Sequence, residues 1–231
     1  GGTDICGCFM LGVPNLPIYA GQIQGPALGL DVQVFTEDGK PAAVGIKGEL
    51  VCRNAFPSVP LYFWDDSDGN KFRSAYFERF AGVWTHGDFV EVTAEGGYVM
   101  HGRSDATLNA GGVRVGTAEI YRITEEFAEI VESLAIAQNW EGDTRVVLFV
   151  KLSDGALLSE NLINQIKSAL KQKASPRHVP ALIMQAPDFP RTKSNKLVEI
   201  AVANAINKLA ITNLGALANP ESLDWFINLN L

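Results

Sequence analysis

The first hundred residues contain short runs of apolar and β-branched side chains separated by turn residues, a pattern typical of β-strands. The runs occupy residues 18–24, 30–35, 48–52, 84–92 and 98–102. Between them, the segments EDGK at 37–40 and EGG at 95–97 have the Gly and acidic residues of tight turns. Strands joined by short turns predict a small antiparallel or barrel-like unit.

The pattern changes after Arg103, where helical repeats alternate with short apolar runs. Leu162, Ile166 and Leu170 recur at helical spacing, which predicts an amphipathic helix over residues 159–173. We also predict helices at 117–127, capped by Thr117, and at 197–209, and strands at 134–138, 146–152 and 181–185. Because strands that alternate with helices form α/β units, we place a domain boundary at residues 103–106.

The composition, with 47% hydrophobic and 19% charged residues in 231, is that of a globular protein long enough to bury its own core. The net charge of −7 argues against a nucleic-acid binder, whose surface would be basic, but it does not exclude a nucleotide ligand. No apolar run reaches the ~18 residues of a membrane span, so we expect no membrane association.

Cys6, Cys8 and Cys52 lack the spacing of a zinc site and are odd in number, so we expect reduced thiols in a cytosolic protein. No basic flank and apolar core of a signal peptide stand at the start. The chain begins at Gly1 rather than Met, and we expect it to be a fragment of a longer protein.

The stretch with the most chemical information is GRSDATLNAGGVRVGTAEIY at residues 102–121. Gly111 and Gly112 permit backbone conformations and close approaches that side chains forbid. Arg103 and Arg114 flank the turn, and their guanidinium groups match phosphate and hydroxyl acceptors. A surface hairpin with salt-bridged arginines explains the same pattern, so the chemistry alone leaves both interpretations open.

This stretch resembles the hinge and glycine-loop motif of the adenylate-forming enzymes. Three further segments resemble motifs of the same superfamily in the same order: Gly2-Thr3-Asp4, THGDF at 85–89 and PRTKSNK at 190–196. Each motif is weak alone, but four in order over nearly the whole chain are specific. The segments GGTDIC at 1–6, PRHVP at 176–180 and ALANPESL at 216–223 narrow the resemblance to acetoacetyl-CoA synthetases.

The resemblance implies a mixed α/β (α+β) fold in three parts. Residues 1–102 would be the β-rich end of a large N-terminal AMP-binding domain, residues 103–106 a hinge, and residues 107–231 a small mobile α/β domain. It also implies an ATP-dependent acid–CoA ligase, in which ATP and acetoacetate give an acyl-adenylate and pyrophosphate, and CoA then gives acetoacetyl-CoA and AMP.

The expected cofactors and partners are therefore small molecules: ATP or AMP, Mg²⁺, coenzyme A and acetoacetate, with no obligate protein partner and no nucleic acid. Two alternatives remain open. One is a ligase for another short acid, because most of the acid pocket would lie upstream. The other is a non-catalytic remnant that keeps nucleotide or CoA contacts.

Four residues of the first part acquire nucleotide roles by resemblance. Thr3 would donate its hydroxyl to the α-phosphate, and Asp4 would bind Mg²⁺, for which a carboxylate is a suitable hard ligand. Asp88 would accept hydrogen bonds from the ribose hydroxyls, and Arg103 would bind the ribose or the phosphate. Without the resemblance, Thr3, Asp4 and Asp88 would be ordinary turn residues.

The remaining roles fall on the hinge and the second part. Asp105 would be the hinge residue, Gly112 would border the pantetheine tunnel, and Arg114 would contact the adenylate phosphate or CoA. Lys196 would be the catalytic residue of adenylation, with its ammonium between carboxylate and α-phosphate oxygens. Asn195 stands where the family usually has Gly; if the position requires positive φ, Asn is the least costly replacement.

Two groups of side chains keep a plainer interpretation. Lys167, Lys171 and Lys173 share one predicted helix and would reach CoA phosphates only if that helix faces the cofactor; a solvated basic face is the simpler interpretation. His86, His101 and His178 lack the spacing of a metal site, and we assign them no catalytic role.

Overall fold

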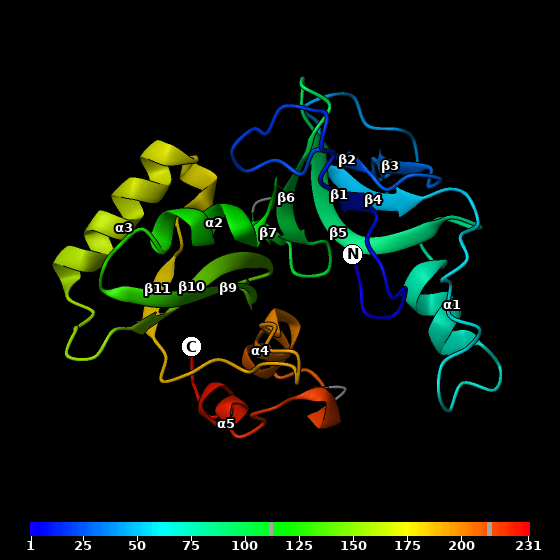
Figure 1. Ribbon diagram of the computed structural model, residues 1–231. Coiled ribbons are helices and arrows are strands. Elements are labelled where there is room, and N and C mark those ends of the chain that lie inside the picture. The colour runs from blue at the N-terminus through cyan, green and yellow to red at the C-terminus, as the bar shows by residue number, and fades with distance from the viewer. Residues whose placement is uncertain (111–112, 212–213) are drawn as a thin grey trace. The chain divides into compact units, whose positions relative to one another are not determined.

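An open antiparallel sheet organises the first of two compact units, Gly1–Ser104, in the computed structural model (Figure 1). The structure describes residues 1–110, 113–211 and 214–231. The sheet has the order β3 (Val32–Phe35), β4 (Gly48–Cys52), β5 (Trp84–Val92) and β6 (Tyr98–Arg103). A two-stranded sheet of β1 (Met10–Leu11) and β2 (Gly25–Pro26) and the helix α1 (Asn70–Tyr76) complete the elements of this unit.

Aromatic side chains fill the core of this unit. Phe9, Phe56 and Trp84 are buried and meet edge to face, with ring centroids 5.3–6.4 Å apart. Such edge contacts suit the charge distribution of aromatic rings and add to the stabilisation from burial. The core therefore fixes the strand β5, which carries the residues of the candidate site.

The predicted antiparallel arrangement of this unit is confirmed, but the barrel-like alternative and the strand over residues 18–24 are wrong. The sheet is open, with β3 and β6 at its edges, and not barrel-like. Residues 18–24 form no strand: of these, Ile23 alone makes a bridge, to Tyr98. Next to this segment, the Gln24 side chain accepts a hydrogen bond from the Val13 N–H at 2.9 Å and donates to the Leu16 and Pro17 carbonyls. These side-chain bonds hold the loop of residues 13–17 that leads into it.

The second unit, Asp105–Leu231, has a three-stranded sheet of order β11 (Leu182–Gln185), β10 (Asp143–Leu152) and β9 (Ile130–Trp140). β10 is antiparallel to β9 and parallel to β11. The β9–β10 connection is a tight turn at Glu141 and Gly142, which both have positive φ, as the type I′ turn of a two-residue hairpin requires. A hairpin of β7 (Leu108–Ala110) and β8 (Val113–Val115) precedes the sheet.

Helices contact both faces of this sheet. Val146, Leu148 and Val150 of β10 pack with α2 (Thr117–Thr124) and α3 (Glu160–Lys173), whereas Val147 and Phe149 pack with α4 (Glu199–Ile206) and α5 (Ser222–Ile227). Because successive strand side chains point to opposite faces, β10 contributes to two separate apolar cores. Two short 3₁₀ turns, η1 (Pro176–His178) and η2 (Leu214–Ala216), lie in the connections.

The predicted mixed α/β class is confirmed, and most predicted strands and helices are present with shifted ends. Ser159 caps α3, since its hydroxyl accepts a hydrogen bond from the Leu162 N–H at 3.2 Å. Thr117 is not the cap of α2 but its first residue; the cap is Gly116, whose N–H donates to the Glu119 carboxylate at 3.2 Å. The sequence shows no clear periodic pattern of apolar residues at α1, at α5 or at the β7–β8 hairpin.

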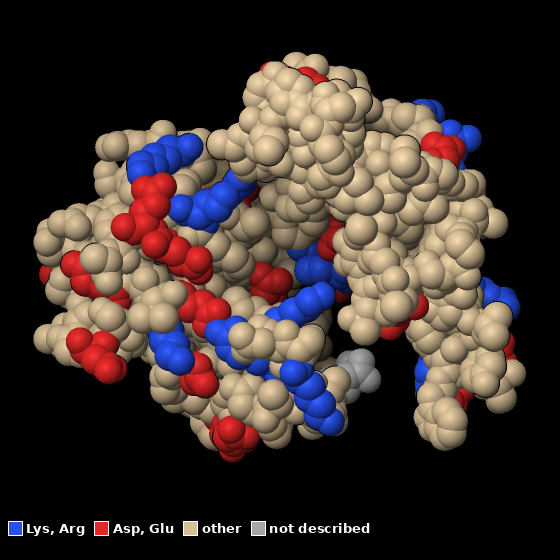
Figure 2. Space-filling model, viewed as in Figure 1, with Lys and Arg blue, Asp and Glu red and all other residues tan. Residues whose placement is uncertain are grey.

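The unit boundary lies between Ser104 and Asp105, within the segment 103–106. The role of that segment as a hinge, and the assignment of the first unit to a larger domain, stay predictions. Within the described ranges, none of the helices has the length and apolar character needed to span a bilayer. On the face seen in Figure 2, acidic and basic side chains intermingle over the second unit rather than forming a patch of one sign.

Candidate functional site

A carboxylate and a guanidinium lie opposite each other on β5 and β6 of the first unit. Asp88 pairs with Arg103 in the strand register, and the Arg103 Nη1 atom donates to Asp88 Oδ1 at 3.3 Å and to the His86 carbonyl oxygen at 3.1 Å. Asp88 is buried, and its Oδ2 atom lies 3.6 Å from His86 Nε2. The structure thus brings together Asp88 and Arg103, the two residues that would bind the ribose according to the resemblance.

Gly87 makes this approach possible. Its φ is +79, and a Cβ built there would lie 2.5 Å from the Arg103 Nη2 atom. A side chain at this position would therefore occupy the place of the guanidinium. The "Gly-Asp" pair of the motif has a physical reason here: glycine makes room for Arg103, and the next residue binds it.

A buried glutamate, which sequence reasoning missed, holds the β5 backbone at Gly87. Glu49 on β4 is 1% exposed; its Oε1 atom accepts from the Gly87 N–H at 2.7 Å, and its Oε2 atom accepts from Arg79 at 2.8 Å. Burial raises the pKa of the Glu49 carboxyl, and these hydrogen bonds oppose that shift. The available signal was a charged residue inside the otherwise apolar run GELVC.

The Thr3–Asp4 turn lies beside this pair of strands. Thr3 and Asp4 are exposed, and the turn is closed by the Cys6 N–H, which donates to the Thr3 carbonyl at 3.0 Å. A Cβ built on Gly2 would lie 3.1 Å from the His86 ring. His86 is therefore the link between this turn and Asp88, although its spacing in the sequence gave it no role.

The Asp4 carboxylate accepts a hydrogen bond from the phenol of Tyr76, at the end of α1. The Tyr76 ring stacks on Trp84 with 3.7 Å between centroids. Burial, followed by the hydrogen bond to Asp4, raises the pKa of Tyr76, so the phenol stays a donor. One exposed, oriented carboxylate suits a Mg²⁺ ion that keeps waters and substrate phosphates as its other ligands. Among the described residues, no cluster of three or more His, Cys, Asp or Glu suits a metal.

Lys196 lies in a tight turn of the second unit and is exposed. The Thr192 N–H donates to the Lys196 carbonyl at 2.8 Å, and the Lys196 N–H donates to the Thr192 hydroxyl at 3.1 Å. Asn195 has φ +64, in the left-handed region, so the position does require a residue that tolerates positive φ. The turn thus keeps its shape with Asn in place of Gly.

Three residues of the glycine-loop stretch were given roles by the resemblance: Asp105, Gly112 and Arg114. Arg114, on β8, donates to the Thr107 hydroxyl from Nη2 at 3.0 Å and from Nε at 3.3 Å. The hairpin interpretation of this stretch is therefore present in the fold, with Arg114 bonded within it. Asp105 is exposed at the start of the second unit, and Gly112 lies outside the described residues. Lys173 of α3 forms an ion pair with Glu126.

Comparison with known proteins shows what this chain is similar to. No family model matches the sequence. An acetoacetyl-coenzyme A synthetase of Rhizobium meliloti is 57% identical over 229 residues, which are 99% of this chain and 35% of that protein. An acetoacetyl-CoA synthetase of Xenopus tropicalis is 46% identical over 231 residues, 34% of its length. This chain is a homologue of the acetoacetyl-CoA synthetases.

The fold agrees with this homology. The acetoacetyl-CoA synthetase from Streptomyces lividans superposes with a TM-score of 0.90 at 40% identity, over 98% of this chain and 34% of that one. The resemblance to the adenylate-forming enzymes, drawn from four motifs, is confirmed. The chain spans about one third of the length of the curated relatives that it matches.

Proposed function

We propose that the protein to which this chain belongs is an ATP-dependent ligase that activates acetoacetate as an acyl-adenylate and transfers it to CoA. The observation that carries the proposal is the 57% and 46% identity, over 99% of the chain, to proteins named acetoacetyl-CoA synthetase. Adenylate-forming CoA ligases use ATP and CoA. The free thiols of Cys6, Cys8 and Cys52 suit a reducing compartment and support the cytosol as its location.

The first unit would bind the nucleotide. Asp88 would accept hydrogen bonds from the two ribose hydroxyls, because one carboxylate receives two donors. Arg103, held beside it at 3.3 Å, would bind the same ribose or contact the phosphate. Thr3 would donate to the α-phosphate, and Asp4 would hold Mg²⁺, which offsets the charge of the phosphates when it is bound.

The second unit would act in turn in both half-reactions. Lys196 would lie between the carboxylate and the α-phosphate during adenylation, where its ammonium orients both groups and offsets developing charge. Arg114 and Gly112 would serve the CoA side, with Arg114 contacting the phosphate or the cofactor and Gly112 leaving space for pantetheine. Asp105 would absorb the backbone change when the unit turns from one half-reaction to the other.

Assays of the full-length protein with ATP, CoA and a series of acids test this proposal. We expect AMP, pyrophosphate and acetoacetyl-CoA with acetoacetate, and no turnover by the 231-residue chain alone. A higher kcat/KM for acetate or another short acid would replace acetoacetate as the substrate. Binding of ATP and CoA without turnover of any acid would contradict the ligase assignment.

A further inference from the structure

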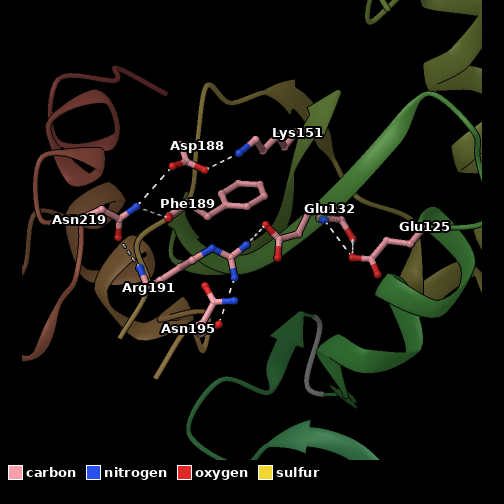
Figure 3. A network of polar contacts seen from close by, with 9 residues as sticks. Glu125, Glu132, Lys151, Asp188, Phe189, Arg191, Asn195 and Asn219 are labelled. Carbon is pink, nitrogen blue, oxygen red and sulfur yellow. Dashed lines mark hydrogen bonds and ion pairs between the residues drawn. The ribbon is translucent and has the colours of Figure 1, made fainter. Parts of the chain in front are cut away.

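The arginine next to the candidate catalytic turn is bonded to both the turn and the sheet. Arg191 forms an ion pair with Glu132 of β9 through Nη2, and its Nη1 atom donates to the Asn195 carbonyl oxygen at 3.2 Å (Figure 3). The Arg191 and Glu132 side chains are only 24% and 20% exposed. Because the Asn195 carbonyl belongs to the same peptide plane as the Lys196 N–H, this guanidinium fixes the plane from which Lys196 projects.

The backbone of Arg191 is held as well, by a segment more than twenty residues further along. The Ala218 N–H donates to the Arg191 carbonyl at 2.8 Å, and the Lys193 N–H donates to the Ala216 carbonyl at 3.2 Å. The Arg191 N–H in turn donates to the Asn219 side-chain oxygen at 2.8 Å. The turn therefore lies on residues 216–219, which we call the tail segment.

Asn219 connects this tail segment to the sheet. Its side-chain nitrogen donates to the Phe189 carbonyl at 2.9 Å and to the Asp188 carboxylate at 3.4 Å, and Asp188 pairs with Lys151 of β10 at 2.7 Å (Figure 3). The turn is thus tied to β9 through Arg191 and to β10 through Asn219. Each tie involves an ionised group, and such hydrogen bonds are stronger than neutral ones.

We propose that Arg191 is the positioning residue for Lys196, and that the tail segment is its backbone support. The inference rests on the proposed function. An exposed turn of five residues has little apolar burial of its own and would sample several orientations if it were not held. The reaction rate falls steeply when a side chain that must lie between two substrate groups is misplaced by about 1 Å. The two ties supply the orientation that the turn itself lacks.

Arg191→Met in the full-length protein tests the positioning role. We expect acetoacetate-dependent pyrophosphate exchange to fall about 10–100-fold, through kcat rather than KM, because the other substrate contacts remain while the misplaced lysine offsets the developing charge poorly. Conversion of supplied acetoacetyl-adenylate to thioester should not change. Arg191→Lys should restore little, because one ammonium lacks the planar fork that serves Glu132 and the Asn195 carbonyl together.

Lys193→Ala is the matched control, since it removes a positive charge from the same turn while leaving Arg191 in place. Hydrogen exchange of the 191–197 backbone gives a readout that does not depend on activity. We expect faster hydrogen exchange of this backbone in Arg191→Met. Lys193→Ala should change neither the hydrogen exchange nor the pyrophosphate exchange.

Three results would overturn the inference. The first is that hydrogen exchange and kinetics are both unchanged in Arg191→Met. The second is faster hydrogen exchange without any loss of adenylation. The third is a parallel loss in both half-reactions together with a lower melting temperature. An unsubstituted protein without pyrophosphate exchange would instead overturn the proposed function, and the positioning role with it.

Discussion

Replacing Gly87 by alanine tests how β5 and β6 hold Arg103 against Asp88. An added Cβ would lie 2.5 Å from the Arg103 Nη2 atom, and the φ of +79 is unfavourable for any residue with a Cβ. The left-handed conformation reduces stability by about 1–2 kcal/mol for alanine. Because the clashing atom ends a flexible side chain, we expect the guanidinium to move and to lose its 3.3 Å contact with Asp88.

Gly96→Ala is the matched control for this change. Gly96 lies in the turn between the same two strands, has φ +82, and has no atom within 4 Å of its added Cβ. Both variants should lose the same ~1–2 kcal/mol from backbone strain. Gly87→Ala should lose a further ~0.5–1 kcal/mol; the contribution is small because the Arg103 side chain is 50% exposed and solvent screens the pair.

Urea unfolding of the chain measures the difference in stability between the two variants. In the full-length protein, pyrophosphate exchange at varied ATP concentration measures the effect on nucleotide binding. We expect the KM for ATP to rise about 2–5-fold in Gly87→Ala, in line with the lost contact, and to stay unchanged in Gly96→Ala. Equal losses of stability together with equal KM values would refute the argument that glycine at this position serves Arg103.

Three other predictions use the same assays. Lys196→Ala should lower pyrophosphate exchange by about 10²–10³ while supplied adenylate still forms thioester; parallel losses would contradict its role. Asp105→Pro should spare one half-reaction and impair the other, since proline fixes φ near about −65°; equal loss of both would count against a hinge. Glu49→Gln should make the free energy of unfolding less dependent on pH. Burial raises the pKa of Glu49, so the native state keeps this proton to a higher pH than the unfolded chain does, and stability falls as pH rises above 4.5. Unfolding profiles of identical pH slope would contradict this.

The parts of the fold that the sequence predicts well are those with a periodic signal and nearby turn residues. The strands β4 and β5 have the predicted bounds, and β5 ends shortly before the Gly-rich acidic turn at 95–97. The predicted strand at residues 18–24 is absent, and beside it the Gln24 side chain bonds to the backbone of Val13 and Leu16. A periodic pattern of apolar residues does not reveal such side-chain-to-backbone bonds.

For the candidate site, the sequence supplied the residues of the motifs and the expectation that Asn195 would tolerate a positive φ. It did not supply their partners. Glu132 lies 59 residues before Arg191, and Glu49 lies 38 residues before Gly87. Such pairs form only when the sheet places distant strands and loops side by side, so no local pattern encodes them. The arrangement of the candidate site thus depends on long-range packing that a motif does not describe.

The two-sided burial of β10 has a consequence for which kinds of mutation the second unit tolerates. Val147 and Leu148 are both buried aliphatic residues that face different cores, so a shift of one residue would exchange them with little hydrophobic penalty. Alternation of apolar and polar residues cannot protect this register. The two-residue turn at Glu141 and Gly142 must do so. Conservative substitutions along the strand should therefore be accepted readily, whereas an insertion of a single residue in that turn would send every β10 side chain to the wrong layer.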